Sequence, residues 1–168
     1  AVGTSTISHI VKGDIIGNGG IIDLNQNSGA SATVFVNLEG NLDIKAASQL
    51  TSTDDGCKYV FGKSGLQTIS NASSSGLGSR VDFEVASGST TRLINQNFSL
   101  TNATNNFSVF SGGILEFNYF DITGLGVFDL NTLGTLRITS SNGVNASGAF
   151  GNVQSTGTRT FSQTGIYH

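Results

Sequence analysis

One stretch contains the pattern on which the fold depends, Phe128-Asp129-Leu130-Asn131-Thr132-Leu133-Gly134-Thr135-Leu136-Arg137-Ile138. Apolar and polar residues alternate on both sides of Gly134, with Phe128 and Leu130 before it and Leu136 and Ile138 after it. Alternation with a period of two is typical of β-strands that bury one face. Glycine suits a sharp bend because it adopts positive φ angles without steric cost. The stretch therefore predicts a strand, a turn and a second strand.

The same unit recurs along the whole sequence. Apolar pairs two residues apart precede most of the turn glycines, and further apolar residues follow them. A third, weaker apolar cluster is present in several units, as at Leu100, Ile122 and Val144. After a less regular first unit around Gly20, the turn glycines are 22 to 25 residues apart. We predict that they form a structural ladder of Gly40, Gly65, Gly88, Gly112, Gly134 and Gly157.

A repeat of about 23 residues with three short strands predicts an all-β fold, a right-handed parallel β-helix (β-solenoid) of about seven coils. Each coil must stack on its neighbours to bury its inner face. An antiparallel β-sandwich is the alternative, because it also contains many short strands. Pairing between residues about 23 apart, such as Val109 with Leu130, would distinguish the two folds. We expect residues 1–168 to form a single β-helix domain, a fragment of a longer repeat protein.

The composition narrows the function classes. Only 11% of the residues are charged, proline is absent, and Ser, Thr and Asn supply most polar positions. The absence of proline fits strands that donate hydrogen bonds on both edges. A net charge of −3 argues against nucleic-acid partners, and no apolar run is long enough for membrane insertion. Cys57 is the only cysteine, and we interpret it as a small buried apolar residue rather than a nucleophile.

Few residues are candidates for chemistry. The outward position in the strand after each turn glycine is expected to be occupied, coil by coil, by Asp43, Thr68, Arg92, Glu116, Arg137 and Thr160. The charges alternate in sign at Arg92, Glu116 and Arg137, which favours an outward charge ladder over a catalytic group. Asp54 and Asp55 form the only local acidic pair, and whether they bind calcium stays open because a calcium loop needs more oxygen ligands. We therefore expect no catalytic, cofactor-binding or metal-binding residues, no cofactor and no enzymatic activity.

Other positions give more local expectations. Arg159 falls on an inward position beside Phe161, which predicts a bulge or fraying in the last unit. Phe35 and Val60 point outward on adjacent coils and would form a small apolar patch that could dock another chain. Three asparagines, 24 and 23 residues apart, could form a stacked ladder or could simply be turn residues: Asn71, Asn95 and Asn118.

The repeat units resemble the repeat regions of large secreted surface proteins of the Bacteroidota, the β-strand-repeat adhesins and passenger-like proteins exported by the type IX route. The resemblance covers about the last 60 residues well. In the remainder it is limited to the spacing of the repeat. It is closest in three stretches: Leu133-Gly134-Thr135-Leu136-Arg137-Ile138-Thr139-Ser140-Ser141-Asn142-Gly143-Val144, Gly151-Asn152-Val153-Gln154 and Gly157-Thr158-Arg159-Thr160-Phe161.

The resemblance implies secretion, an extracellular location at the cell surface, a very long parent polypeptide and a role as a stalk or adhesin segment. The implied partners are flanking repeats of the same polypeptide or stacked copies of itself, together with surface glycans or proteins. One alternative function is carbohydrate binding or polysaccharide cleavage on one face of the helix. Another is ice binding, which would require regular outward rows of threonine.

Overall fold

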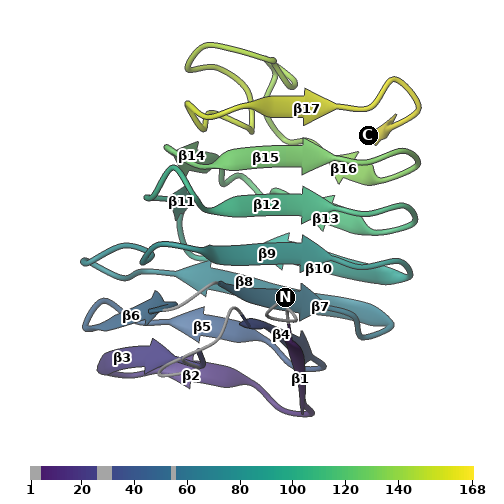
Figure 1. Cartoon of the computed structure of the whole chain (residues 1–168). Coiled ribbons are helices and arrows are strands. Elements are labelled where there is room, and N and C mark those ends of the chain that lie inside the picture. Colours follow the sequence, from purple (N-terminus) through teal and green to yellow (C-terminus); the bar gives the residue numbers. More distant parts are fainter. Residues whose placement is uncertain (1–4, 26–31, 54–55) are drawn as a thin grey trace.

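The computed structural model describes residues 5–25, 32–53 and 56–168. Within these residues the chain forms strands and no helix, and the strands stack in parallel into a right-handed β-solenoid (Figure 1). The first wall is a parallel sheet of β1 (Ser5–Val11), β4 (Ala32–Leu38), β7 (Cys57–Phe61), β9 (Val81–Val85), β12 (Asn106–Val109), β15 (Val127–Leu130) and β17 (Arg159–Phe161).

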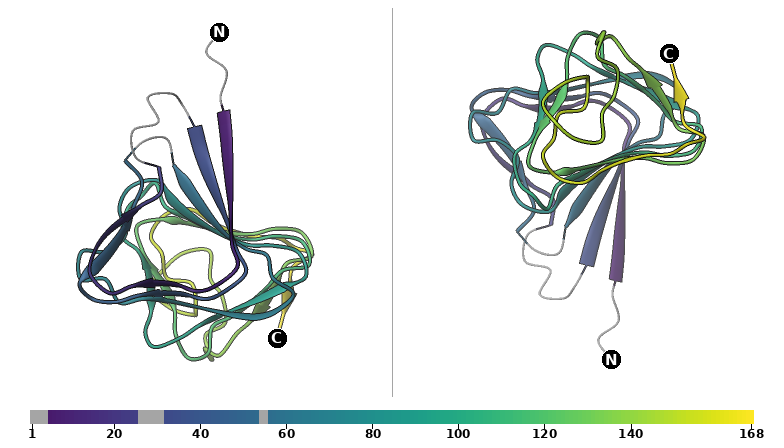
Figure 2. Two further views of the ribbon diagram at one scale, coloured as in Figure 1. Left: turned by 90° about the horizontal axis from the view of Figure 1, so that it is seen from below. Right: turned by 90° about the horizontal axis from the view of Figure 1, so that it is seen from above.

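The second wall is also a parallel sheet, and the third wall is shorter. The second contains β2 (Ile15–Gly17), β5 (Leu42–Ile44), β8 (Gly65–Asn71), β10 (Ser89–Leu93), β13 (Ile114–Glu116), β16 (Thr135–Arg137) and β18 (Ile166–Tyr167). The third consists of two strand pairs, β3 (Gly20–Asp23) with β6 (Ser48–Thr51) and β11 (Phe98–Leu100) with β14 (Ile122–Gly124). Views along the axis show the three walls enclosing the interior, with β1 and β4 fanning away from the body (Figure 2). Buried apolar side chains fill this interior.

The pairing register confirms the β-solenoid and excludes the antiparallel sandwich. Val109 of β12 pairs with Leu130 of β15 in parallel, as the repeat predicted. The number of turns, about five, is slightly lower than the seven predicted. Within the described ranges, the third wall has no strand in the coil between those of β6 and β11, and after β14 only an isolated bridge between Ile122 and Val153 continues it.

Identical register positions stack aromatic rings inside the first wall. Tyr59, Phe83, Phe107 and Phe128 are fully buried, and the ring centroids of successive residues lie 5.9, 5.9 and 6.3 Å apart. Phe98 of the third wall packs edge-on against Phe83, with the centroids 5.0 Å apart and the ring planes at 87°. Offset stacks and edge-to-face pairs are the favourable aromatic arrangements. The core side chains are therefore apolar, and their rings also pack in a defined geometry.

Gly88 and Gly112 occupy the same corner of neighbouring coils. The Gly88 N–H donates to the Gly112 carbonyl at 3.0 Å, and the two residues have φ angles of 79° and 76°. The next coil places Leu133 at this position, because the Gly112 N–H donates to the Leu133 carbonyl at 3.1 Å. Leu133 has a φ of 59°, a left-handed conformation that costs a residue with a Cβ atom about 1–2 kcal/mol.

The other predicted ladder glycines do not continue this row. Gly65 begins β8 and pairs with Ser89, one position away from Gly88. Gly40 lies against the backbone of Gly13, where a Cβ atom would overlap it. Gly20, assigned to the first unit, begins β3 in the third wall. The length of each corner varies by a residue or more, so the spacing of glycines only approximates the register.

The assignment of Gly157 is corrected by the structure. Gly157 lies before β17, at a different corner, where a Cβ atom would overlap the backbone of Gly126. In the last coil the counterpart of Gly134 is Gly165, since the next residue, Ile166, donates its N–H to the Gly134 carbonyl at 2.9 Å. The long segment between β16 and β17 shifts the last unit, and spacing alone did not reveal this.

The strained corner gives a first prediction. We expect Leu133→Gly to be more stable than Leu125→Gly by about 1 kcal/mol in free energy of unfolding. Both leucines are 54% exposed, so the two changes remove similar contact area, but only Leu133 has a positive φ. Urea unfolding of both variants measures the difference. Equal stabilities would show that the Leu133 corner stores no strain.

Candidate functional site

Glu116 lies between two arginines on the outer face of the second wall. Parallel pairing aligns Arg92 of β10 with Glu116 of β13, and Glu116 with Arg137 of β16. Arg92 Nε donates to Glu116 Oε2 at 2.6 Å, and Arg137 Nη1 donates to Glu116 Oε1. The Glu116 side chain is only 10% exposed, while those of Arg92 and Arg137 are 39% and 51% exposed. The structure thus brings the three predicted residues into contact.

The outward row differs from the sequence projection on both sides of these residues. Thr68 pairs with Arg92 as projected. Asp43 pairs with Ser70 instead, and its carboxylate accepts a hydrogen bond from Lys45 of the same coil. Thr160, projected to follow Arg137, is in the first wall and pairs with Asp129. The charged row is therefore short.

The two arginines control the titration of Glu116. Burial raises the pKa of this carboxyl, but hydrogen bonds and charge attraction from Arg92 and Arg137 outweigh it and hold the pKa below the usual 4.5. Glu116 is therefore ionised at neutral pH. A carboxylate held in this form by two cations is a poor general acid or base, because proton transfer would have to disrupt both pairs.

A shallow pocket of about 220 Å³ borders these charges. Beside the three charged residues, its lining consists of Asn118, Tyr119, Ile138 and Thr139. Tyr119 is 85% exposed and has a φ of 70°, and its N–H donates to Thr139 Oγ1 at 3.1 Å. Such strained backbone is concentrated at functional sites. The pocket offers one accessible aromatic ring and guanidinium donors, which can bind an apolar sugar face and anionic or polar groups.

Sequence reasoning identified the charges of this pocket but did not place Tyr119 beside them. Tyr119 lies in the corner after β13, where neither the period of two nor the period of about 23 constrains the side chain. Two consecutive residues with positive φ, Asn118 and Tyr119, create the corner. The Tyr119 ring is exposed because of this local conformation, for which the sequence contained no separate signal.

Cys57 is inert in the folded protein. Its side chain is 1% exposed, and burial raises the pKa of the thiol to about 12. The thiolate, which is the nucleophilic form, is therefore scarce at neutral pH. The candidate pair Asp54 and Asp55 lies outside the described residues. Among the residues that the structure describes, no group of three or more His, Cys, Asp or Glu side chains could hold a metal ion.

The predicted apolar patch is smaller than expected. Phe35 is half-buried, but Val60 is only 9% exposed. Lys58 accompanies them, with its ammonium 5.7 Å from the centroid of the Phe35 ring and 5.9 Å from that of Phe110. The Lys58 ammonium also pairs with Glu84 at 3.2 Å. A cation over two aromatic rings makes this surface mixed rather than apolar.

Two of the three asparagines, Asn95 and Asn118, behave as turn residues, whereas Asn71 is the last residue of β8. Asn95 and Asn118 have φ angles of 71° and 48°. Asn95 Nδ2 donates to Ser70 Oγ, and Asn118 Nδ2 donates to the Leu93 carbonyl, each at 3.4 Å. These bonds reach the preceding coil without linking one asparagine amide to the next. The turn alternative therefore describes them better than a stacked ladder.

Comparisons with family models, curated proteins and solved structures found no match to this chain. In the part of the chain that the structure describes, no helix is long and apolar enough to cross a membrane.

The position of Glu116 predicts a pH-dependent contribution to stability. We expect Glu116→Gln to lower the free energy of unfolding at pH 7 by about 1 kcal/mol, because partly exposed pairs contribute little each. Since the folded pKa lies below the usual 4.5, the contribution is complete above that pH and disappears as the pH falls through the folded pKa. The wild type and the variant should therefore converge in strong acid.

Urea unfolding between pH 7 and pH 3 measures this difference. Glu39→Gln is the matched control, since Glu39 is exposed and forms no ion pair within the described residues. If Glu116→Gln follows the wild type across the whole range, the paired charges do not stabilise the fold.

Proposed function

We propose that this chain is a structural and adhesive segment of a secreted bacterial cell-surface protein, a stalk or adhesin repeat region. The observation that supports this most is the uninterrupted parallel pairing of seven strands in each of two walls. Six spacings of about 4.8 Å make a rod of about 29 Å. In a solenoid of this type each coil is stabilised by contacts with its nearest neighbours. Coils can therefore be added in series to lengthen the rod, as a spacer requires.

The contrast between middle and terminal coils supports the proposed partners. Val34 in the second coil is 1% exposed, whereas its register partner Ile7 in the first coil is 40% exposed. Flanking repeats of the same polypeptide, or a stacked copy of the chain, would cover exposed residues such as Ile7 in the same way that each inner coil is covered by its neighbours. The extracellular location and the bacterial origin rest on the resemblance of the repeat motifs to secreted surface proteins.

The location is tested on intact cells of the organism that encodes the chain. Antibodies raised against the purified chain are expected to label intact and permeabilised cells equally, and mild protease treatment of intact cells should remove the label. A cytoplasmic protein quantified in parallel verifies that the cells are sealed. Labelling that appears only after permeabilisation would contradict the surface location.

Carbohydrate binding is a second candidate, favoured by the exposed Tyr119 ring beside Arg92 and Arg137. Aromatic rings and planar donors are suited to sugar faces and sugar hydroxyl or carboxylate groups. Ice binding is less well supported, because the outward row at Arg92, Glu116 and Arg137 consists of charges rather than threonines.

For the second candidate, a glycan array probed with the labelled chain is expected to give signals that Tyr119→Ala abolishes. Tyr167→Ala is the control, since Tyr167 is also accessible but lies outside the pocket. A signal that both variants retain would exclude this pocket as the binding site. Turnover of a polysaccharide that is lost in Glu116→Gln would overturn the non-enzymatic proposal itself.

A further inference from the structure

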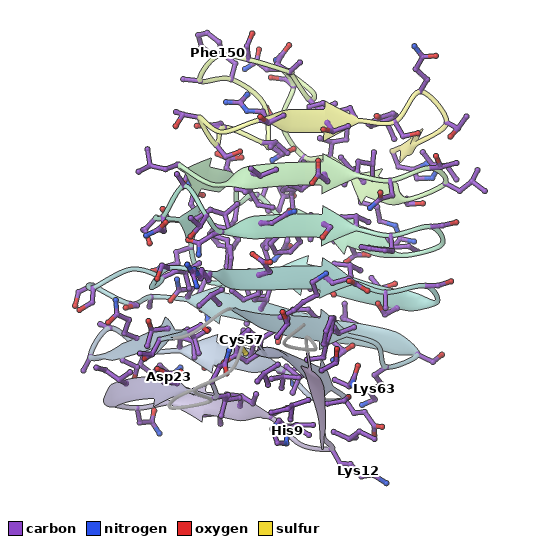
Figure 3. All side chains as sticks on the ribbon, viewed as in Figure 1. His9, Lys12, Asp23, Cys57, Lys63 and Phe150 are labelled. Atoms are coloured by element: carbon purple, nitrogen blue, oxygen red, sulfur yellow. The ribbon has the colours of Figure 1, made fainter. Side chains whose placement is uncertain are left out.

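The segment between β16 and β17 forms a loop over the C-terminal end of the solenoid. The side chain of Asn152 anchors its base, because Asn152 Oδ1 accepts the N–H groups of Thr139 and Ser140, each at 2.9 Å. Asn152 Nδ2 donates to Asp121 Oδ1 at 3.0 Å. Phe150 of this loop and His9 lie at opposite ends of the molecule (Figure 3). In the last coil, this loop therefore takes the place of a third-wall strand and covers the C-terminal end of the solenoid.

Arg159 lies beneath this loop in a position that an aromatic residue fills in the preceding coils. It pairs with Phe128, the last ring of the aromatic row, and is only 8% exposed. The strand continues regularly through Thr160 and Phe161, so the bulge predicted from the sequence is absent. Three backbone carbonyls accept hydrogen bonds from the guanidinium: those of Ser155, Asn145 and Gly148.

The charge of Arg159 has no counter-ion among the described residues. Their ion pairs involve other cations, and no carboxylate pairs with this guanidinium. Burial lowers the pKa of Arg159, yet a guanidinium stays protonated at neutral pH. Burying a cation without an anion is costly, and carbonyl dipoles compensate only part of the cost. The site therefore favours a negative ligand.

A cavity of about 380 Å³ adjoins the guanidinium. Its lining contains no carboxylate, and its polar groups come from four loop residues, Ser147, Gln154, Ser155 and Thr156, and from Arg159 of β17. Ser155 is fully buried, and its Oγ has no hydrogen-bond partner. Ser48, Ser52 and Thr91 also have buried hydroxyls without partners, so the guanidinium and the polar lining of the cavity are what favour a ligand here.

We propose that this cavity binds a small organic carboxylate, with Arg159 as the anion-binding residue. Its Nε, Nη1 and Nη2 each donate one hydrogen bond to a carbonyl, so two of its five N–H groups remain, one on each terminal nitrogen. Two such donors match the two oxygens of a carboxylate. The volume leaves room for a sugar acid, whose hydroxyls the serine and threonine side chains can bind.

The binding test uses the full chain labelled with ¹⁵N and titrated with sodium D-glucuronate. Saturable shifts are expected at the amides of Ser147, Gly148, Ser155 and Thr156. D-Glucose, matched in ionic strength with sodium chloride, is expected to produce none. Sodium acetate should cause the same shifts. If the sugar hydroxyls contribute, acetate will need about tenfold higher concentration than glucuronate, and if the carboxylate alone is recognised, the two will act at equal concentration. Both results support a carboxylate site.

Two variants separate ligand binding from loop anchoring. Arg159→Lys keeps the charge but loses the planar pair of donors, and it is expected to weaken glucuronate binding at least about tenfold. Ser147→Asp introduces a carboxylate into the lining, and it should raise the melting temperature and abolish binding. Ser141→Asp places the same charge on an exposed position of the loop outside the cavity, and it should do neither.

The proposal is overturned if glucuronate causes no saturable shifts, or if glucose causes the same ones. It is also overturned if Ser147→Asp binds glucuronate as the wild type does. In each case Arg159 would serve only to hold the loop through its three carbonyl partners. The Ser147→Asp result is decisive even if Arg159→Lys fails to fold, because it leaves those partners in place.

Discussion

Parallel hydrogen bonding between coils is the constraint from which the other features follow. Each strand finds its partners about one repeat away in the sequence, so the residues that stack are those with the same place in the repeat. A slip of one residue would move every inward side chain to the outside. Tyr59, Phe83, Phe107 and Phe128 therefore share one inward row, and differences in repeat length must be absorbed at the corners.

The strands were predictable because the pattern of apolar residues that forms them is periodic. A period of two located the inward residues, and a period of about 23 located their partners, including Val109 with Leu130. The contact of Glu116 with Arg92 and Arg137 followed from the same register. The corners obey no such period. Leu133 occupies a left-handed position that Gly88 and Gly112 fill in the two preceding coils, and no glycine marks it. Glycine spacing also assigned Gly157 to the corner of Gly134, whereas it lies at a different corner.

The candidate pockets were harder to predict than the strands, since both lie where the repeat is interrupted. Tyr119 is exposed by two consecutive residues of positive φ, and the cavity at Arg159 exists because a loop replaces a third-wall strand. The two sites differ in their electrostatics. At the first, Glu116 neutralises part of the charge of Arg92 and Arg137, whereas at the second the guanidinium of Arg159 has only dipoles as partners. Binding affinity for an anion should therefore be greater at the buried site.

The burial of Cys57 has a consequence for the conditions under which the chain keeps its fold. The thiol is enclosed between stacked coils, and this chain has no second cysteine with which to form a cross-link. Its stability then depends on packing, on hydrogen bonds and on ion pairs such as those of Glu116, none of which consumes or releases electrons. The folded chain should accordingly be indifferent to redox potential, equally stable in a reducing and in an oxidising compartment.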